Sequence, residues 1–498
     1  MPGSLLVAGT TSDAGKSVVT AGVCRLLARE GLSVAPFKAQ NMSNNSMVTA
    51  AGAEIGRAQW VQAVAAGAEP EPAMNPVLLK PSSDRRSHVV VMGQPAGRLE
   101  AGEYAGGRAH LAEAAFAAYD DLRSRFDVVV CEGAGGVAEI NLREWDYVNL
   151  GLAQHDSMPT LLVADIDRGG VFAQLYGSVA LLDERDQALV AGFVINKFRG
   201  DVSLLAPGTT ELERLTGRPV LGILPWQHGL WLDSEDAVAI DQRPLPRDAA
   251  HALRVAVLAF PRISNFTDID ALSLEPDVDV RFVSRPEDVT AADLVVLPGT
   301  RSTLGDLAWM RDRGLDEAVR RHAASGLPVL GICGGCQMLG QEIVDPDGVE
   351  GPAGATVPGL GLLEMRTTFE RDKALALVEG EWSGEKVSGY VIHHGRITLG
   401  DNATPFLDGM EQDAVRGTMW HGSLESDGFR RRLLSNAARS AGRTSFRPDP
   451  DLSFTDARMS RLDLLADLLE EHIGVDPLLR LIEQGTPRGL PFIAAGPR

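Results

Sequence analysis

The chain has 498 residues, of which 47 are basic and 67 are acidic, so its formal charge at pH 7 is −20. This length predicts two to four domains of ~150 residues each, and the hydrophobic fraction of 44% excludes disorder as the dominant state. The acidic balance argues against a general nucleic-acid binder, because such proteins carry basic surfaces that displace counterions from phosphates.

Cysteine use and the N-terminal residues predict a protein of the reducing cytoplasm. Four cysteines in so long a chain do not make a disulfide framework. The first residues, MPGSLLVAGTT, lack the basic stretch of a signal peptide. No apolar run approaches the ~20 residues that span a bilayer. We therefore expect a cytoplasmic protein that does not bind membranes.

Short apolar runs alternate with helix-length stretches through the first half of the chain. The stretches 17–30 and 109–125 have the length and composition of helices. Alternating buried strands and helices predict an α/β fold with a mostly parallel sheet. The strands of this first series are expected at 4–9, 34–39, 128–132, 160–165, 191–196 and 220–225.

A second α/β series begins after an acidic and then proline-bearing stretch, which predicts an interdomain linker. Its strands are expected at 254–260, 278–284, 294–298 and 329–333, and both domains are predicted to be doubly wound. The residues at 460–482 have an amphipathic helical period. We expect a first domain at 1–226, a linker at 227–252, a second domain at 253–430 and a helical extension at 431–498.

A glycine-rich loop, Gly9-Thr10-Thr11-Ser12-Asp13-Ala14-Gly15-Lys16-Ser17, follows the first predicted strand and precedes a helix. Such a loop presents N–H groups and the positive end of the helix dipole to phosphate oxygens. The lysine would reach the β- and γ-phosphates, and the serine hydroxyl would bind Mg²⁺. A chance glycine-rich turn is the alternative, but the strand–loop–helix context favours a nucleotide site. The predicted nucleotide-binding residues of the loop are Thr11, Asp13, Ala14, Gly15, Lys16 and Ser17.

Polar side chains also follow other strands of the first domain. Glu132 ends a valine-rich strand, from which a carboxylate can hold Mg²⁺ or its waters. Asn196 ends another strand and is either a side-chain amide that reads a base or a turn residue. Glu54 is either a second metal carboxylate or an acid on a helix surface.

The chain has only 6 lysines, and four of them lie in or beside strand ends of the first domain. One of these, Lys38, opens an amide-rich run that continues to Ser46. This run is either a polar loop with Asx turns or a ligand site, since open α/β sheets bind ligands at the carboxyl ends of their strands. The four lysines are Lys16, Lys38, Lys80 and Lys197.

The first domain resembles the dethiobiotin synthetase group of P-loop enzymes. The resemblance rests on the early first glycine of the loop, on Phe37-Lys38, on the segment 54–59 and on the turn 132–136. Members of that group use ATP to phosphorylate a carboxyl or carbamate oxygen. The resemblance implies that Lys16 contacts phosphate, that Lys38 lies between nucleotide and substrate, and that Asn196 reads the base. It also implies an Mg²⁺ ion surrounded by Ser17, Glu54 and Glu132.

In the second domain, a strand at 329–332 leads into Cys333-Gly334-Gly335-Cys336-Gln337 and a helical start. This is the pattern of a nucleophile elbow with cysteine in place of serine. Small neighbours suit the strained backbone of the nucleophile. Cys336 is expected to be a packing residue. A redox or zinc Cys-x-x-Cys site is the alternative, but no second cysteine pair completes a zinc site.

A thiolate nucleophile needs a base from elsewhere in the chain. The candidates are His421 and the adjacent pair His393 and His394, all at apparent strand ends.

The second domain resembles the class I glutamine amidotransferases. That resemblance implies that Cys333 is the nucleophile, that His421 is the base, and that the Gly299 and Gly334 amides form the oxyanion hole. The glutamate that usually follows the histidine by two residues is replaced by Ser423. A Cys–His dyad is therefore expected.

As a whole, the chain resembles the glutamine-dependent corrinoid amidases of adenosylcobalamin biosynthesis, through segments at 9–17, 37–47, 74–81, 164–173, 196–201, 263–270 and 390–395. The resemblance implies ATP-dependent amidation of the b, d, e and g carboxylates of adenosylcobyrinic acid a,c-diamide. It also implies acyl phosphate intermediates and ammonia released from a Cys333 thioester. The substrate-binding candidates are Lys38, Gln40, Asn41, Asn44 and Asn45.

Two alternatives stay open. The first is an a,c-diamide synthase of the same pathway or another ATP-dependent amidoligase, and the Asn-rich segment 40–45 argues against the former. The second is a partitioning-type ATPase with a degenerate amidotransferase tail, which the intact Cys333 and His421 disfavour.

Overall fold

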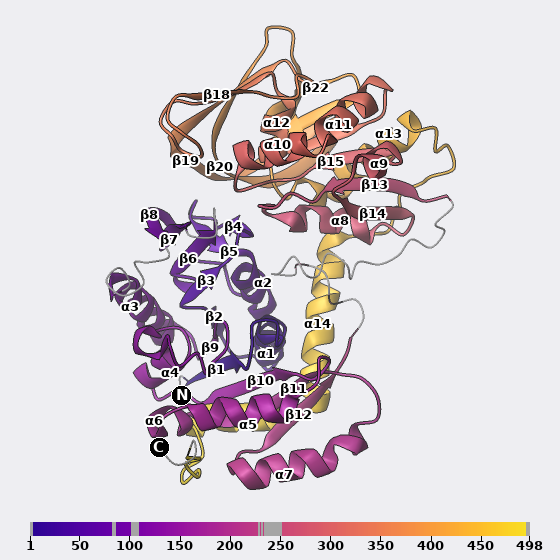
Figure 1. The fold of residues 1–498 in the computed structure, drawn as a ribbon. Coiled ribbons are helices and arrows are strands. Elements are labelled where there is room, and N and C mark those ends of the chain that lie inside the picture. The colour runs from indigo at the N-terminus through magenta and orange to yellow at the C-terminus, as the bar shows by residue number, and fades with distance from the viewer. Residues whose placement is uncertain are drawn as a thin grey trace.

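The computed structural model describes residues 3–81, 86–100, 109–227, 230, 233 and 251–494. Two α/β units follow one another along the chain (Figure 1). We call the elements from β1 to β12 the front domain and those from β13 to α13 the rear domain. The predicted linker at 227–252 lies mostly outside the described residues.

The front domain is built on a parallel sheet of six strands in the order β12-β11-β10-β1-β9-β2. Side chains that alternate along β1 enter two different core clusters, one on each face of the sheet, as expected for a sheet covered on both sides. The strands are β1 (Gly3–Gly9), β2 (Val34–Phe37), β9 (Val128–Glu132), β10 (Thr160–Asp165), β11 (Val190–Phe198) and β12 (Val220–Pro225).

Helices cover both faces of this sheet. Apolar side chains of α1 pack with Leu5 and Val7 of β1, whereas those of α3 and α5 pack with Leu6 and Ala8. The predicted doubly wound α/β architecture is confirmed. The helices are α1 (Lys16–Arg29), α2 (Arg57–Ala66), α3 (Ala109–Arg125), α4 (Leu150–His155), α5 (Val171–Leu181), α6 (Glu184–Gln187) and α7 (Ala206–Thr216).

The rear domain has a seven-stranded sheet in the order β14-β13-β15-β16-β23-β22-β21. Its first five strands are parallel, and the last two pair in antiparallel fashion. Because β16 and β23 are neighbours, the residues that follow them meet at one edge of the sheet. The strands are β13 (Leu253–Leu258), β14 (Val278–Val283), β15 (Leu294–Leu297), β16 (Val329–Ile332), β21 (Thr404–Phe406), β22 (Gly409–Gln412) and β23 (Val415–Thr418).

Three smaller sheets were not among the predicted elements. In the front domain, the strands β3 to β8 lie at the end that faces the rear domain (Figure 1). They are β3 (Gln40–Met42), β6 (Val77–Pro81), β7 (Arg86–Val91) and β8 (Gln94–Glu100) in one sheet, and β4 (Ser46–Val48) and β5 (Glu54–Gly56) in a second. The rear domain adds β17 (Glu342–Asp345), β18 (Ala355–Pro358), β19 (Met365–Trp382) and β20 (Glu385–Leu399).

The C-terminal helices join the two domains. After α13 (Asp427–Ser440), helix α14 (Phe454–His472) begins in the rear core at Phe454 and continues along α1 of the front domain (Figure 1). Gly22 of α1 permits this close packing, because a Cβ atom there would lie 2.7 Å from Leu469 Cδ1. The amphipathic stretch predicted at 460–482 is two helices, since α15 (Val475–Gln484) starts after Gly474.

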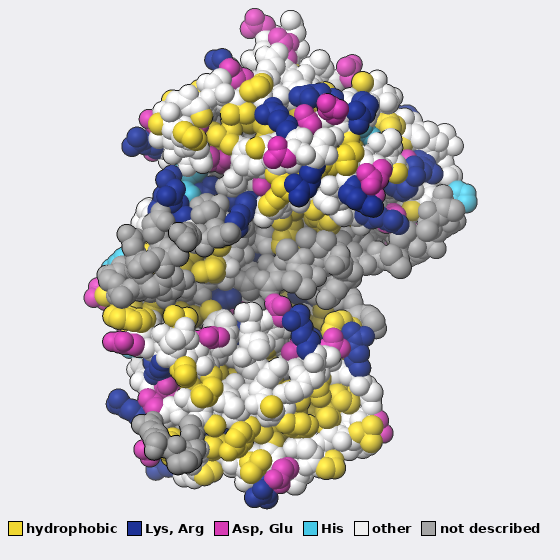
Figure 2. Space-filling model, in the orientation of Figure 1, with side chains coloured by type: hydrophobic (Ala, Val, Ile, Leu, Met, Phe, Trp, Pro, Cys, Tyr) yellow, Lys and Arg dark blue, Asp and Glu magenta, His cyan; other side chains and the backbone are white. Residues whose placement is uncertain are grey.

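Acidic and basic side chains are interspersed on the face of the rear domain seen in Figure 2, so the charge of −20 forms no single acidic patch there. Within the described part of the chain, no helix combines the length and the apolarity needed to cross a membrane.

Candidate functional site

The glycine-rich loop joins β1 to the N-terminus of α1, as predicted. Gly15 immediately precedes the helix with a φ of 101°, a backbone conformation that favours glycine. A Cβ atom on Gly15 would lie only 2.0 Å from Asn196 Nδ2. The Asn196 amide donates to the Ala14 carbonyl oxygen at 3.0 Å. The end of β11 therefore packs against the phosphate loop and stabilises its conformation.

Charged and polar side chains converge where the loop meets the end of β9. The Lys16 ammonium donates to the carbonyl oxygens of Thr11 (2.9 Å) and Gly135 (3.0 Å). The Ser17 hydroxyl donates to Glu132 Oε1 at 2.8 Å, and Lys38 forms an ion pair with the same oxygen at 2.8 Å. Glu132 is fully buried. The structure thus places Lys16, Ser17, Lys38 and Glu132 together.

A cavity of about 660 Å³ opens beside this cluster. Its lining includes loop residues, Lys38, Gln40, Asn41 and Glu132, together with residues 196–197 and 225–227. Three apolar side chains on its wall are well exposed: Met42 (51%), Leu142 (41%) and Trp145 (41%). The cavity is large enough for a nucleotide and part of a second ligand.

The amide-rich run divides into two parts. Gln40 and Asn41 line the cavity, where Gln40 accepts a hydrogen bond from the Tyr147 hydroxyl at 2.5 Å. Asn44 and Asn45 do not line it, and the Asn44 amide donates to the Pro81 carbonyl oxygen at 3.3 Å. The structure therefore brings only the first half of the run to the phosphate loop.

Glu54, predicted as a metal ligand, does not line the cavity. It is fully buried and forms ion pairs with Lys80 at 2.5 Å and with Lys373 of the rear domain. Burial opposes ionisation of Glu54, but the two lysines outweigh it and hold its pKa well below the usual range. The Glu54 oxygens thus bind two lysines at the domain boundary. The prediction that Glu54 shares a metal site with Ser17 and Glu132 is therefore wrong.

Among the described residues, no group of three or more His, Cys, Asp or Glu side chains is arranged to hold a metal ion. The Ser17 hydroxyl and the Glu132 carboxylate are adjacent oxygen donors. Mg²⁺ is commonly held by one or two protein oxygens together with waters and substrate phosphates. This pair fits such a site.

Cys333 lies between β16 and α12 (Gly334–Leu339) with φ 51° and ψ −111°. A positive φ at a residue with a side chain is strained, and such strain is typical of the nucleophile position in an elbow. The backbone N–H of Cys333 donates to the Thr418 carbonyl oxygen at 2.8 Å, which ties the elbow to β23. Cys336 is fully buried in the rear core.

His421, three residues after β23, lies close to the Cys333 thiol, which is among the groups that raise the pKa of the imidazole. The Nδ1 atom of His421 lies 2.6 Å from Oδ2 of Asp268. Asp268 was not identified as a functional residue from the sequence. The second oxygen of Asp268 accepts the Gly422 N–H at 2.8 Å. The expected dyad is therefore a Cys–His–Asp arrangement. Asp268 lies in segment 263–270, one of the segments that carry the family resemblance, but no spacing to Cys333 or His421 indicated that it has a role in the site.

The electrostatics of this arrangement favour a charged imidazole. Burial opposes the charged form of His421, but Asp268 and then Cys333 outweigh it and raise its pKa to about 10. The other two candidate bases have different surroundings. Burial and Arg396 lower the pKa of His393 to about 4. The Nδ1 atom of His394 lies 3.1 Å from the Glu370 carbonyl oxygen. The geometry thus favours His421 as the base.

Two glycines border the thiol and the imidazole. A Cβ atom on Gly299 would lie 2.7 Å from His421 Cε1, and one on Gly334 would lie 2.6 Å from Thr300 Cγ2. The backbone at Gly299 therefore approaches His421, and the start of α12 approaches Thr300, more closely than a side chain at either glycine would permit. This placement is compatible with the expected oxyanion hole.

If the second domain hydrolyses glutamine, as its resemblance implies, we expect Asp268→Asn to lower the rate by roughly 10²-fold and to change its pH dependence. Because the carboxylate raises the pKa of His421, its removal lowers that pKa, and the alkaline limb of the profile moves to lower pH. Rates of glutamate release between pH 6 and 10 measure this. Asp401→Asn, at an exposed turn, should keep the original profile, and an unshifted limb in Asp268→Asn contradicts the assignment.

Two family models match the chain. Residues 5–237 match the CobQ/CobB/MinD/ParA nucleotide binding domain, and residues 254–430 match the CobB/CobQ-like glutamine amidotransferase domain. Proteins named cobyric acid synthase match the full length. Those of Mycolicibacterium gilvum (62% identity, 99% of each chain), Mycobacterium ulcerans (60%, 100% of each) and Mycobacterium tuberculosis (60%, 99% of each) are examples.

The full-length identity confirms the family expected from the sequence, and the two domain matches coincide with the two sites described above. The chain therefore belongs to the cobyric acid synthase family of glutamine-dependent amidoligases.

Proposed function

We propose that this protein uses ATP and glutamine to convert the b, d, e and g carboxylates of adenosylcobyrinic acid a,c-diamide into amides, giving adenosylcobyric acid. The observation that carries this proposal is the presence, in one chain of this family, of two sites with complementary chemistry. One is a phosphate-loop cavity lined by Lys16, Lys38 and Glu132. The other is the thiol–imidazole–carboxylate set of Cys333, His421 and Asp268.

In the rear domain, the Cys333 sulfur would attack the side-chain amide carbon of glutamine while the Gly299 and Gly334 amides stabilise the oxyanion. The His421 imidazolium would give its proton to the departing nitrogen, which leaves as ammonia. Water, deprotonated by His421, would then cleave the thioester and release glutamate. Asp268 would hold His421 in the orientation and tautomer that both steps need.

In the front domain, a substrate carboxylate oxygen would attack the γ-phosphorus of ATP and release ADP. The Lys16 ammonium would stabilise the charge that develops on the phosphate oxygens. Ser17 and Glu132 would hold an Mg²⁺ ion, which would neutralise negative charge on the nucleotide phosphates. Ammonia would then attack the acyl carbon of the acyl phosphate, and inorganic phosphate would leave with formation of the amide.

The walls of the cavity suit a corrinoid. Lys38, Gln40 and Asn41 present one cationic group and two amides toward ligands that carry carboxylates and amides on their rim. Met42, Leu142 and Trp145 offer an exposed apolar surface, which a flat macrocycle can cover. Asn44 and Asn45 are further from the cavity and are not part of this proposal.

The experiment that tests the proposal is mass spectrometry of the product formed from adenosylcobyrinic a,c-diamide, ATP and glutamine. We expect four successive carboxyl-to-amide conversions that require ATP. Cobyrinic acid, which lacks the a and c amides, is the comparison substrate. Efficient amidation of cobyrinic acid that stops after two additions contradicts the proposal and favours an a,c-diamide synthase.

A further inference from the structure

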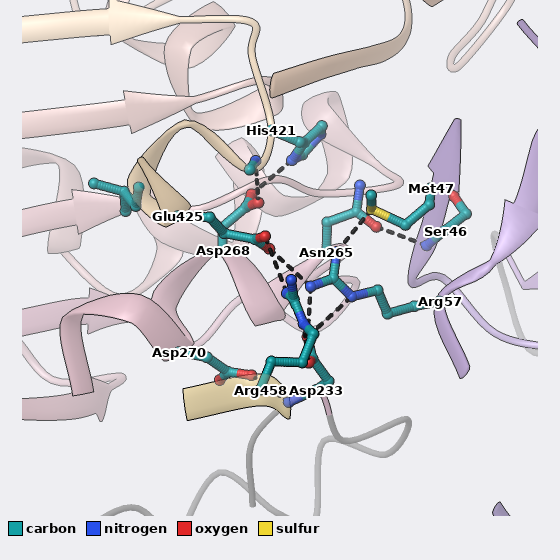
Figure 3. A network of polar contacts seen from close by, with 12 residues as sticks. Ser46, Met47, Arg57, Asp233, Asn265, Asp268, Asp270, His421, Glu425 and Arg458 are labelled. Carbon is teal, nitrogen blue, oxygen red and sulfur yellow. Dashed lines mark hydrogen bonds and ion pairs between the residues drawn. The ribbon is translucent and has the colours of Figure 1, made fainter. Parts of the chain in front are cut away.

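A short segment of the front domain runs from the cavity to the amidotransferase site. Gln40 and Asn41 of β3 line the cavity, and β4 begins with Ser46 a few residues later. The Ser46 N–H donates to Asn265 Oδ1 of the rear domain at 2.9 Å (Figure 3). Both residues are buried. The segment that contacts the proposed substrate thus also contacts the rear domain.

Asn265 is directly linked to the residues that hold His421. It lies in the left-handed region with φ 50° and precedes the 3₁₀ turn η5 (Phe266–Ile269), which contains Asp268. The Asn265 carbonyl oxygen accepts the Asp268 N–H at 3.0 Å, and Asp268 in turn contacts His421 and Gly422 (Figure 3). Ser46 and the catalytic imidazole are therefore separated by two hydrogen-bonded residues.

The other side of Ser46 is fixed to the front domain. Its hydroxyl donates to Glu54 Oε1 at 2.8 Å and accepts from Lys80 at 2.8 Å. Lys80 lies on β6, which pairs with β3. A ligand that moves β3 therefore acts on a strand pair whose polar contacts include Ser46.

A second polar connection runs in parallel. Glu425, four residues after His421, forms ion pairs with Arg57 of α2 at 2.7 Å and with Arg458 of α14 at 3.0 Å (Figure 3). Both arginines also bind the buried carboxylate of Asp233. Arg57 and Asp233 are fully buried, so a substitution at either leaves an uncompensated charge and could reduce activity through misfolding, whereas the Glu425 side chain is 21% exposed to water. Asn265 is the cleaner site for a test.

We propose that Asn265 is a positioning residue, through which occupation of the front cavity sets the orientation of Asp268 and His421 and so turns on glutamine hydrolysis. This inference rests on the proposed function. Small displacements of a catalytic group change rates strongly, and a coupling of this kind typically changes a rate or affinity by roughly 5- to 150-fold. Its consequence is that ammonia is released chiefly when ATP and corrinoid are present to use it.

The test measures glutamate release from the full-length protein with and without ATP plus adenosylcobyrinic a,c-diamide. The ratio of the two rates is the stimulation. Asn265→Gly keeps the left-handed backbone and removes the amide, whereas Asn265→Asp keeps an acceptor oxygen for the Ser46 N–H. We expect stimulation in the unsubstituted protein, a loss of roughly fivefold or more of it in Asn265→Gly, and its retention in Asn265→Asp. Asn402→Gly, at an exposed turn, is the matched control.

Amidation from added ammonium, which bypasses glutamine, should be unchanged in Asn265→Gly. Glu425→Gln tests the parallel connection and should also reduce the stimulation. An unstimulated parent protein, or full stimulation in both Asn265→Gly and Glu425→Gln, overturns the inference. So does an equal loss of basal and stimulated hydrolysis in Asn265→Gly that Asn265→Asp does not restore. Absence of ammonium-driven amidation in the parent protein would instead overturn the proposed function.

Discussion

Replacement of Cys333 by alanine should abolish amidation from glutamine while leaving amidation from added ammonium. The thiol is the only proposed source of the thioester, so its loss should reduce glutamine-dependent activity by roughly 10³-fold or more. The front cavity contains neither Cys333 nor His421, so phosphorylation of the carboxylate should continue. Product formation with each nitrogen source, at mildly alkaline pH where more of the ammonium is deprotonated to ammonia, measures both effects.

Cys336→Ala is the matched control for this experiment. Cys336 is in the same helix turn and is fully buried, so its replacement tests packing and the Cys-x-x-Cys alternative together. We expect it to keep glutamine-dependent activity. Equal loss of both activities in a folded Cys333→Ala protein would contradict the separation into two sites.

Replacement of Lys16 by alanine should have the complementary result, with no amidation from either nitrogen source. Lys16 is the loop lysine at the N-terminus of α1, and it borders the cavity beside Ser17 and Lys38. Without its charge, the developing negative charge on the γ-phosphate loses a principal partner, and we expect a loss of about 10²-fold or more in acyl phosphate formation. ADP release and amide formation measure the loss.

Lys386→Ala provides the control, because this lysine is exposed on β20 of the rear domain. It should amidate at the normal rate. Basal glutamate release should persist in Lys16→Ala, since Cys333 and His421 are untouched. Substantial product from ammonium in Lys16→Ala would show that the phosphate loop is not where the carboxylate is activated.

Local sequence patterns predicted most of the main-sheet strands and the two motif loops. The runs at 128–131 and 329–332 are apolar over their whole length, as expected for strands covered on both faces. The phosphate loop and the cysteine elbow are contiguous, and each follows its strand directly. Their functional residues could be predicted because the residues that act together are neighbours in the sequence.

The small strands β3, β4 and β5 were missed because each has only three residues, with polar side chains among them, and makes no apolar run. Glu54 illustrates the consequence. It has the residue type of a metal ligand, yet Lys80 and Lys373, 26 and 319 positions away, take its oxygens. The scarce lysines therefore divide: Lys16, Lys38 and Lys197 line the cavity, whereas Lys80 balances a buried carboxylate.

By itself, the sequence determined the two α/β units, the phosphate loop, the thiol and its candidate histidines, because periodicity and turn chemistry are local properties. Only the tertiary structure decided which histidine meets Cys333 and that Asp268, 153 positions away, supports it. The same is true of the return of α14 to α1 and of the Ser46–Asn265 contact. These depend on strand order and on packing between distant segments, and no fixed spacing along the chain expresses them.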